Sequence, residues 1–205
     1  MTDSNMYIFE NELYKEGVTY IAGVDEAGRG PLAGPVIAAA VILKKGAILK
    51  YVDDSKKLSE KQRMLALEEI KANALAIGIG ISSVEEIDQI NIYRASREAM
   101  LSAIEQLKIR PEFLLVDAMP MEIDIPMKSI IKGDEKSVSI AAASIIAKTT
   151  RDAYMIEMDK LFPQYNFKQH KGYGTKEHLD AIYQYGPTPI HRKSYEPIKS
   201  ILKKK

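Results

Sequence analysis

The sequence has no cysteine, only three histidines and no long apolar run, and each scarcity excludes a class of function. Without cysteine the chain forms no disulfide, zinc finger or iron–sulfur centre, and it has no thiol nucleophile. A metal must therefore be held by oxygen or by the imidazoles of His170, His178 and His191. The longest unbroken apolar run, residues 36–43, is far shorter than the roughly 20 residues that span a bilayer.

The N-terminus and the length set further expectations. Residues 1–10 contain an early Asp3 and no basic cluster, unlike a secretory signal, so we expect a cytoplasmic protein. A chain of 205 residues is long enough for one domain with its own core. We expect a short helical segment over residues 1–18 and one domain over residues 19–205, with a helical extension from about residue 163.

The near-neutral net charge of +1 hides an asymmetry along the chain. Residues 160–205 contain ten Lys or Arg against three Asp or Glu, a net charge of +7, so residues 1–159 carry −6. The same C-terminal part holds all three histidines and five of the eleven tyrosines. Basic groups interleaved with aromatic rings suit a nucleic-acid strand, because cations meet phosphates while rings stack on bases or sugars. A solvated basic helix with core tyrosines fits the same composition.

Hydrophobic periodicity and capping signals predict alternating strands and helices. Ser59 with Gln62, and Ser83 with Glu86, form capping boxes that mark helix starts. The segments expected to be strands are residues 20–26, 36–43, 76–81, 113–116 and 127–131. The expected helices are residues 59–76, 83–107 with a break near Asn91, 134–161, 176–185 and 195–202. This order of elements predicts an α/β domain with a mixed sheet.

Four acidic residues stand where apolar segments end. Asp25 and Glu26 end one expected buried strand and Asp117 ends another, while Asp134 opens the long expected helix. Burying an unpaired carboxylate costs several kcal/mol, so such groups need hydrogen bonds, a cation or a metal. Each alone has a plain structural explanation as a turn-capping residue or, for Asp134, a helix N-cap. Together they suit hard, oxygen-seeking cations such as Mg²⁺ or Mn²⁺.

A second acidic pair, Asp53 and Asp54, has a different setting. It lies in a polar loop with no apolar strand before it, so we expect both side chains to be solvated. Ser55 and Lys56 follow in the same loop and are candidates to hold a phosphate.

A glycine-rich loop, Gly28-Arg29-Gly30, begins two residues after Glu26 and connects two expected strands. It is neither a P-loop nor a dinucleotide fingerprint, because no Gly-Lys-Ser/Thr follows and the next segment is strand-like. Glycines on both sides of an arginine let backbone amides approach a ligand closely, and the guanidinium adds a charged fork. A tight turn with an exposed arginine is the alternative, but the position beside Glu26 favours a loop that reads a substrate.

The long expected helix carries a polar stripe. At about 100° per residue, four side chains fall on one face of this helix: Ser137, Ser144, Lys148 and Arg151. Asp134 lies at the N-terminal edge of the stripe, so one helix presents an acid at its start and phosphate-binding groups farther along. An ordinary amphipathic helix with a solvated face is the alternative interpretation.

The motifs together resemble those of bacterial ribonuclease HII, in the type 2 ribonuclease H family. Residues 21–36 (IAGVDEAGRGPLAGPV) closely resemble the opening motif of that family and are long enough to be highly specific. The shorter matching motifs are residues 54–58 (DSKKL), 115–118 (LVDA), 132–134 (KGD), 139–148 (SIAAASIIAK), 171–175 (KGYGT) with His178, and 191–195 (HRKSY). The resemblance spans about residues 20–197, with one departure at Tyr195, where the family commonly has phenylalanine.

The resemblance implies a ribonuclease H-like fold, a mixed five-stranded sheet flanked by helices, with a C-terminal helical extension. It also implies an activity: hydrolysis of RNA in RNA/DNA hybrids and cleavage 5′ of single ribonucleotides in duplex DNA. The implied cofactors are two Mn²⁺ or Mg²⁺ ions. These nucleic acids are the expected partners of a monomer that binds no membrane.

The resemblance further implies roles for individual residues. The acids that match the metal site of the family are Asp25, Glu26, Asp117 and Asp134. The loop that touches the ribose 2′-hydroxyl matches Gly28, Arg29 and Gly30, and this hydroxyl is what distinguishes RNA from DNA. The tyrosine that contacts the ribose and stacks on the next deoxyribose matches Tyr173. The remaining expected substrate contacts are Ser55, Lys56, Ser144, Lys148, Arg151 and Lys171.

Two other functions stay open at this point. One is a non-catalytic nucleic-acid-binding module in which the acids are structural. The other is the specificity of the sibling ribonuclease HIII, which needs runs of ribonucleotides. The Gly28-Arg29-Gly30 loop and the short N-terminal segment disfavour the second alternative.

Overall fold

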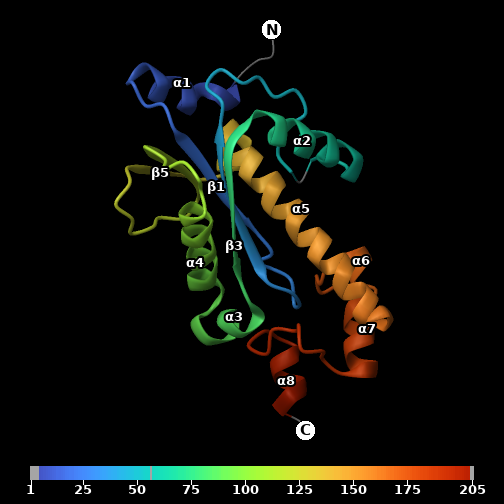
Figure 1. Cartoon of the computed structure of the whole chain (residues 1–205). Coiled ribbons are helices and arrows are strands. Elements are labelled where there is room, and N and C mark those ends of the chain that lie inside the picture. Colours follow the sequence, from blue (N-terminus) through green and yellow to red (C-terminus); the bar gives the residue numbers. More distant parts are fainter. Residues whose placement is uncertain (1–4, 56, 204–205) are drawn as a thin grey trace.

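A five-stranded mixed sheet forms the centre of the computed structural model, which describes residues 5–55 and 57–203 (Figure 1). The strands are β1 (Ile21–Ala27), β2 (Val36–Leu43), β3 (Ala74–Ser82), β4 (Phe113–Asp117) and β5 (Met127–Ile130). Their order in the sheet is β3-β2-β1-β4-β5. β2 is antiparallel to β1 and β3, whereas β4 is parallel to β1 and β5. The predicted mixed sheet is confirmed, with small shifts at the strand ends.

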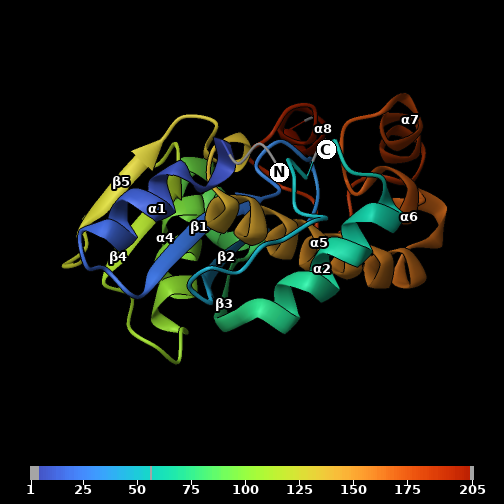
Figure 2. The same ribbon diagram turned by 90° about the horizontal axis from the view of Figure 1, so that it is seen from above.

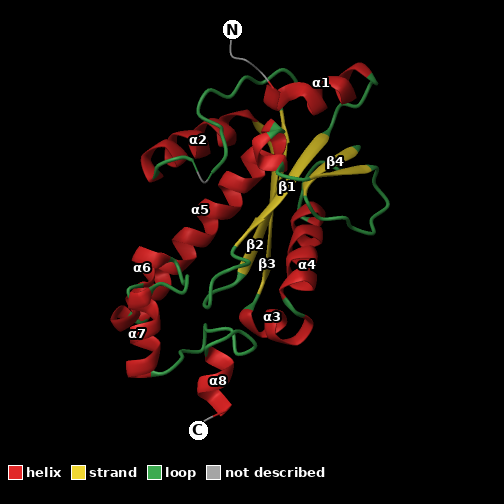
Figure 3. Ribbon diagram, turned by 180° about the vertical axis from the view of Figure 1, so that it is seen from behind, coloured by secondary structure: helices red, strands yellow, loops and turns green. Residues whose placement is uncertain are grey.

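Helices cover both faces of this sheet (Figure 3). They are α1 (Ile8–Lys15), α2 (Glu60–Asn73), α3 (Val84–Ile90), α4 (Ile92–Glu105), α5 (Val138–Leu161), α6 (Phe167–His170), α7 (Lys176–Tyr185) and α8 (Ile198–Lys203). α4 packs on the face that carries Ala38 and Ala40 of β2, and α5 packs on the opposite face with Ala39 and Val41. Because both faces are covered, every β2 residue is apolar and buried.

The start of α5 lies directly against β1. A Cβ atom at Gly23 would lie 2.0 Å from the carbonyl carbon of Ser139, so the two backbones approach as closely as only glycine permits. This approach fixes α5 against the strand that carries Asp25, two residues beyond Gly23.

Two predicted helix starts are confirmed and a third is wrong. The pairs Ser59 with Gln62 and Ser83 with Glu86 both form complete capping boxes. The long helix does not begin at Asp134, which lies in a separate 3-10 turn, Gly133–Glu135. Its N-cap is Ser137, whose hydroxyl accepts the Ile140 N–H at 3.2 Å. The same Ser137 hydroxyl donates to the buried Glu10 of α1 at 2.6 Å, a tertiary contact that the local sequence does not reveal.

The first helix, α1, and the last, α8, lie at opposite ends of the molecule (Figure 1). The view from above shows β4, β5 and α1 on one side and α6 and α7 on the other (Figure 2). Leu13 of the predicted N-terminal helix packs with Leu115 and Ile140, while the boundary at residue 18 stays a prediction. The C-terminal extension, residues 163–203, packs on the second half of α5 through an apolar cluster that includes Phe167 and Ile198. Its last helix begins at Ile198 rather than at residue 195. Within the described residues, no helix is both long and apolar enough to cross a membrane.

Candidate active site

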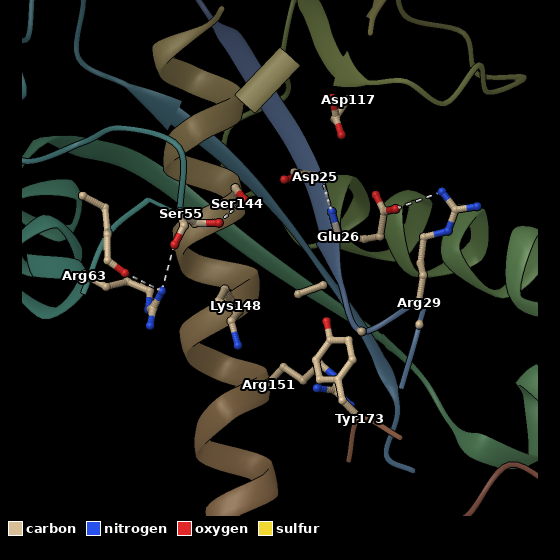
Figure 4. A pocket seen from close by; sticks show the side chains of 14 residues that line it. Asp25, Glu26, Arg29, Ser55, Arg63, Asp117, Ser144, Lys148, Arg151 and Tyr173 are labelled. Carbon is tan, nitrogen blue, oxygen red and sulfur yellow. Dashed lines mark hydrogen bonds and ion pairs between the residues drawn. The ribbon is translucent and has the colours of Figure 1, made fainter. Parts of the chain in front are cut away.

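A cavity of about 470 Å³ opens where β1 and β4 end (Figure 4). The parallel register pairs Val24 with Val116, so the residues that follow, Asp25 and Asp117, reach the same edge of the sheet. Asp25, Glu26 and Asp117 line the cavity, and Asp25 is only 4% exposed. The strand ends therefore bring three of the four predicted acids together.

Burial and mutual repulsion shape the acidity of these carboxyl groups. Burial first, and then the charges of Glu26 and Asp117, raise the pKa of Asp25 well above its ordinary range, although hydrogen bonding to Ser144 opposes the rise. Burial also raises the pKa of Glu26, while Arg29, whose Nη1 lies 3.4 Å from Glu26 Oε1, lowers it. The other oxygen, Glu26 Oε2, is buried and accepts no hydrogen bond from any residue that the structure describes. The charged forms of Asp25 and Glu26 are therefore disfavoured in this cavity unless a cation joins them.

The fourth acid, Asp134, is buried and does not line the cavity. Its neighbour Gly133 donates a backbone hydrogen bond of 2.6 Å to Asp117 Oδ1, which ties the 3-10 turn to the end of β4. Over residues 5–55 and 57–203, no three acids or histidines are arranged as a ready ligand set for a metal ion.

A cationic wall stands opposite the acids, on α5 and the loop before α2 (Figure 4). Ser144 and Lys148, one helical turn apart, line the cavity, and the Ser144 hydroxyl lies 3.0 Å from that of Ser55. Lys148 donates to Asp152 at 2.5 Å, and burial lowers its pKa. Ser137, predicted on the same stripe, instead bonds Glu10 at the buried start of α5.

Arg151 and Arg63 differ from expectation in opposite ways. Arg151 lines the cavity, but its guanidinium is buried and donates to the carbonyls of Ala33, Pro35 and Lys171. Burial lowers its pKa to about 10. Arg63 was not among the predicted site residues, yet it lines the cavity and donates to the Ser55 carbonyl at 2.8 Å. Arg63 lies one turn into the helix that Ser59 caps, and this spacing is the sequence signal that its side chain can reach back to the loop before the helix.

The loop before α2 only partly matches its prediction. Asp53 is exposed as expected, but Asp54 is buried, so the expectation that both are solvated is wrong. The loop folds inward and places the Ser55 side chain against α5. A polar local sequence does not reveal this fold. Lys56 lies outside the described residues.

The glycine loop and Tyr173 form the third side of the cavity. Gly28, Arg29 and Gly30 line it, and the Arg29 side chain is 47% exposed. A Cβ atom at Gly30 would lie 3.6 Å from Tyr173 Cε1, so the loop and the tyrosine ring face each other closely. Lys171 does not line the cavity, and its ammonium donates to the Lys168 carbonyl.

Known proteins of similar sequence and similar fold identify the family. The family model for Ribonuclease HII matches residues 22–198. The chain belongs to the ribonuclease HII family. A ribonuclease HII of Bacillus anthracis is 57% identical over 196 residues, which cover 96% of this chain and 76% of the relative. A ribonuclease HII of Bacillus cytotoxicus is 55% identical over 197 residues, with the same coverage.

A solved structure supports the same assignment. The ribonuclease H2 of Pyrococcus horikoshii matches with a TM-score of 0.77 at 25% identity, over 90% of this chain and 98% of that chain. As a member of the ribonuclease HII family, the chain is a type II ribonuclease H, a metal-dependent endonuclease. The resemblance and the ribonuclease H-like fold predicted from the sequence are confirmed.

Proposed function

We propose that this ribonuclease H cuts the RNA strand of RNA/DNA hybrids and also cuts 5′ of single ribonucleotides in duplex DNA, leaving 3′-hydroxyl and 5′-phosphate ends. The observation that carries the proposal is one cavity with three different walls: three carboxyl groups, a cationic and hydroxyl-bearing helix face, and a glycine loop opposite a tyrosine. These walls suit, in turn, metal ions, a phosphodiester and a ribose. Such an enzyme would serve the excision of ribonucleotides from DNA.

The acidic wall fits divalent cations. Glu26 Oε2 is buried and has no hydrogen-bond donor among the described residues, and such an oxygen is costly unless a cation compensates it. We propose that Asp25, Glu26, Asp117 and Asp134 hold two Mg²⁺ or Mn²⁺ ions. When bound, such ions supply an activated water and stabilise the charge on the departing 3′-oxygen.

The cationic wall is suited to hold the phosphodiester beside the acids. An ammonium group has three donors, so Lys148 keeps donors for a phosphate after it has bonded Asp152. The paired hydroxyls of Ser55 and Ser144 lie on the same wall. Arg63 holds the carbonyl of Ser55 and so orients that residue toward α5. We assign the phosphate to Ser55, Ser144 and Lys148, and a supporting role to Arg63.

The glycine loop and Tyr173 suit one sugar. The side chain of Tyr173 is 46% exposed and its ring faces Gly30, so a ribose can approach the backbone of the loop and the ring together. The 2′-hydroxyl is the group that such a surface must detect, since it alone distinguishes ribose from deoxyribose. A surface built around one sugar can recognise a single embedded ribonucleotide.

The test is a cleavage assay on three duplexes: DNA with one ribonucleotide, a uniform RNA/DNA hybrid, and DNA alone. With Mn²⁺ or Mg²⁺ we expect cleavage of the first two, 3′-hydroxyl and 5′-phosphate products, and no cleavage after addition of a chelator. Binding without cleavage of either ribonucleotide-containing duplex would identify a non-catalytic module. Cleavage of the hybrid alone would indicate the specificity of ribonuclease HIII instead.

A further inference from the structure

The C-terminal extension touches the back of both segments proposed to read the ribose. Ala33 and His191 form an antiparallel bridge behind the glycine loop. The Arg192 N–H donates to the Leu32 carbonyl at 2.9 Å, and the Gly34 N–H donates to the Ile190 carbonyl at 2.8 Å. The backbone around residues 190–192 is therefore joined to the loop that begins at Gly28.

Arg192 holds the glycine loop through its carbonyl groups. Its fully buried guanidinium donates to the carbonyls of Gly28, Arg29 and Gly34. In a planar trans peptide the carbonyl and the next N–H point in opposite directions. Because the carbonyls of residues 28 and 29 point at Arg192, the amides of Arg29 and Gly30 point away from it. Gly28, Arg29 and Gly30 line the cavity and Arg192 does not, so this bonding leaves the amides available to a ligand.

Tyr195 adds a bond to the same loop. Its hydroxyl donates to the Arg29 carbonyl at 2.9 Å and accepts from Arg192 Nη1 at 3.2 Å.

His191, the neighbour of Arg192, belongs to a relay that ends at Tyr173. The Thr188 N–H donates to His191 Nδ1 at 2.9 Å, so the proton of the neutral ring lies on Nε2. That Nε2 lies 3.0 Å from Nε2 of His178. His178 Nδ1 lies 2.9 Å from the Tyr173 carbonyl, which can only accept, so His178 carries its proton on Nδ1 and accepts at Nε2. With these tautomers His191 Nε2 donates to His178 Nε2, and His178 Nδ1 donates to the Tyr173 carbonyl.

The two sets of bonds meet in adjacent residues. His191 acts on Tyr173 through His178, and Arg192 acts on the loop from Gly28 to Gly30. The side chains of His178, His191 and Arg192 are all buried, so solvent does not compete for their hydrogen bonds.

We propose that His178, His191 and Arg192 are positioning residues that hold Tyr173 and the Gly28–Gly30 loop in one fixed arrangement, and so set the preference for a single ribonucleotide. This inference rests on the proposed function, because it assumes that these two segments read the ribose.

The decisive comparison is His178→Leu against His178→Asn. The asparagine amide can occupy the place of Nδ1 and still donate to the Tyr173 carbonyl, whereas leucine cannot. The readout is the ratio of kcat/KM on DNA with one ribonucleotide to kcat/KM on the uniform hybrid. We expect His178→Leu to lower this ratio about tenfold, since small misplacements of a substrate-facing group cost rate. We expect His178→Asn, which keeps the bond to the Tyr173 carbonyl but loses the bond to His191, to lower it only about threefold.

A matched control separates positioning from loss of stability. Ile182 is buried on the same helix, α7, and its apolar side chain has no hydrogen-bonding atom that could take part in the relay. Ile182→Ala should lower the thermal midpoint, which circular dichroism reports, and leave the ratio unchanged. For the loop, Arg192→Lys should lower kcat/KM on both ribonucleotide-containing duplexes while leaving the Kd for DNA alone unchanged, because the phosphate contacts remain.

Two outcomes would overturn the inference. One is a ratio in His178→Leu that stays equal to that of the wild type. The other is a ¹⁵N–¹H spectrum of the wild type in which His178 is protonated on Nε2 or His191 on Nδ1, opposite to the tautomers derived above. Both outcomes can be told apart from failure of the proposed function. If the proposed function is wrong, the wild-type chain itself leaves DNA with one ribonucleotide uncut.

Discussion

The acidic edge of the sheet and the C-terminal extension differ in how far their buried polar groups are hydrogen-bonded. At the ends of β1 and β4, three carboxyl groups share one cavity, and Glu26 Oε2 has no hydrogen bond from the described residues. In the extension, the buried rings of His178 and His191 are hydrogen-bonded through both nitrogens, and the buried guanidinium of Arg192 donates through all three of its nitrogens.

This difference matches the two roles proposed above, metal binding at the acidic edge and positioning of the ribose-reading segments by the extension. An uncompensated charge is a place for a cation to bind, whereas a saturated hydrogen-bond network holds one geometry. The acidic edge can therefore bind cations, whereas the hydrogen bonds of the extension keep it in one conformation. Four predictions test the contrast, in order of decreasing effect.

The largest effect should come from the acidic edge. Asp117→Asn removes a proposed metal ligand while the cationic wall is kept, so kcat should fall about 1,000-fold, equivalent to about 4 kcal/mol of transition-state stabilisation. The Kd for the hybrid should change little. Single-turnover cleavage and fluorescence anisotropy measure the two quantities. Asp124→Asn, an exposed residue outside the cavity, is the control, and wild-type turnover in Asp117→Asn would remove this residue from the metal site.

Acid should destabilise the extension. Burial lowers the pKa of both His178 and His191 to about 4, below the 6.5 of a free ring. Between these values the unfolded chain binds more protons, so stability is full above about pH 6.5 and falls as the pH drops toward 4. A shift of this size corresponds to roughly 3 kcal/mol for one ring. Urea unfolding at several pH values measures the slope.

The non-titrating variant His178→Asn isolates this contribution from the carboxyl groups. The raised pKa values of Asp25 and Glu26 act in the opposite direction, because their neutral forms favour the folded state at low pH. The variant should show a shallower acid loss than the wild type. Equal slopes in the two proteins would mean that His178 does not titrate with folding.

Tyr173→Ala should act selectively. Cleavage of DNA with one ribonucleotide should fall about tenfold more than cleavage of the uniform hybrid, because the loss of base or sugar stacking matters most where a single sugar is read. The measurement is kcat/KM on both duplexes. Tyr183→Ala is the matched control, since this tyrosine is 67% exposed and lies outside the cavity. Equal losses on the two duplexes would contradict the junction role.

The smallest effect should come from the cationic wall. Lys148→Ala should weaken binding regardless of sequence and reduce the slope of log Kobs against log salt by about 0.9, the value for one phosphate contact. Lys160→Ala serves as the control, because Lys160 is exposed and pairs with Glu157. A salt slope identical to that of the wild type would exclude Lys148 from the phosphate contacts.

The sequence by itself determined the strands, the two capping boxes and the positions of Asp25, Glu26 and Asp117 at strand ends, whereas the parallel pairing of β1 with β4 that joins them came from the fold. These features follow from local rules: side chains alternate in strands, and caps satisfy free amides at helix starts. Motif resemblance also pointed to the loop from Gly28 to Gly30 and to Tyr173, which the structure places face to face.

Only the tertiary structure decided which polar residues turn inward. Arg151 and Arg192 carry no local mark of burial, yet each donates to three carbonyl groups from distant parts of the chain. Asp54 is buried despite its polar loop, and Glu10 reaches across from α1 to set the start of α5 at Ser137. The reason is physical: a polar side chain is stable inside when its partners are there, and those partners are far away in sequence.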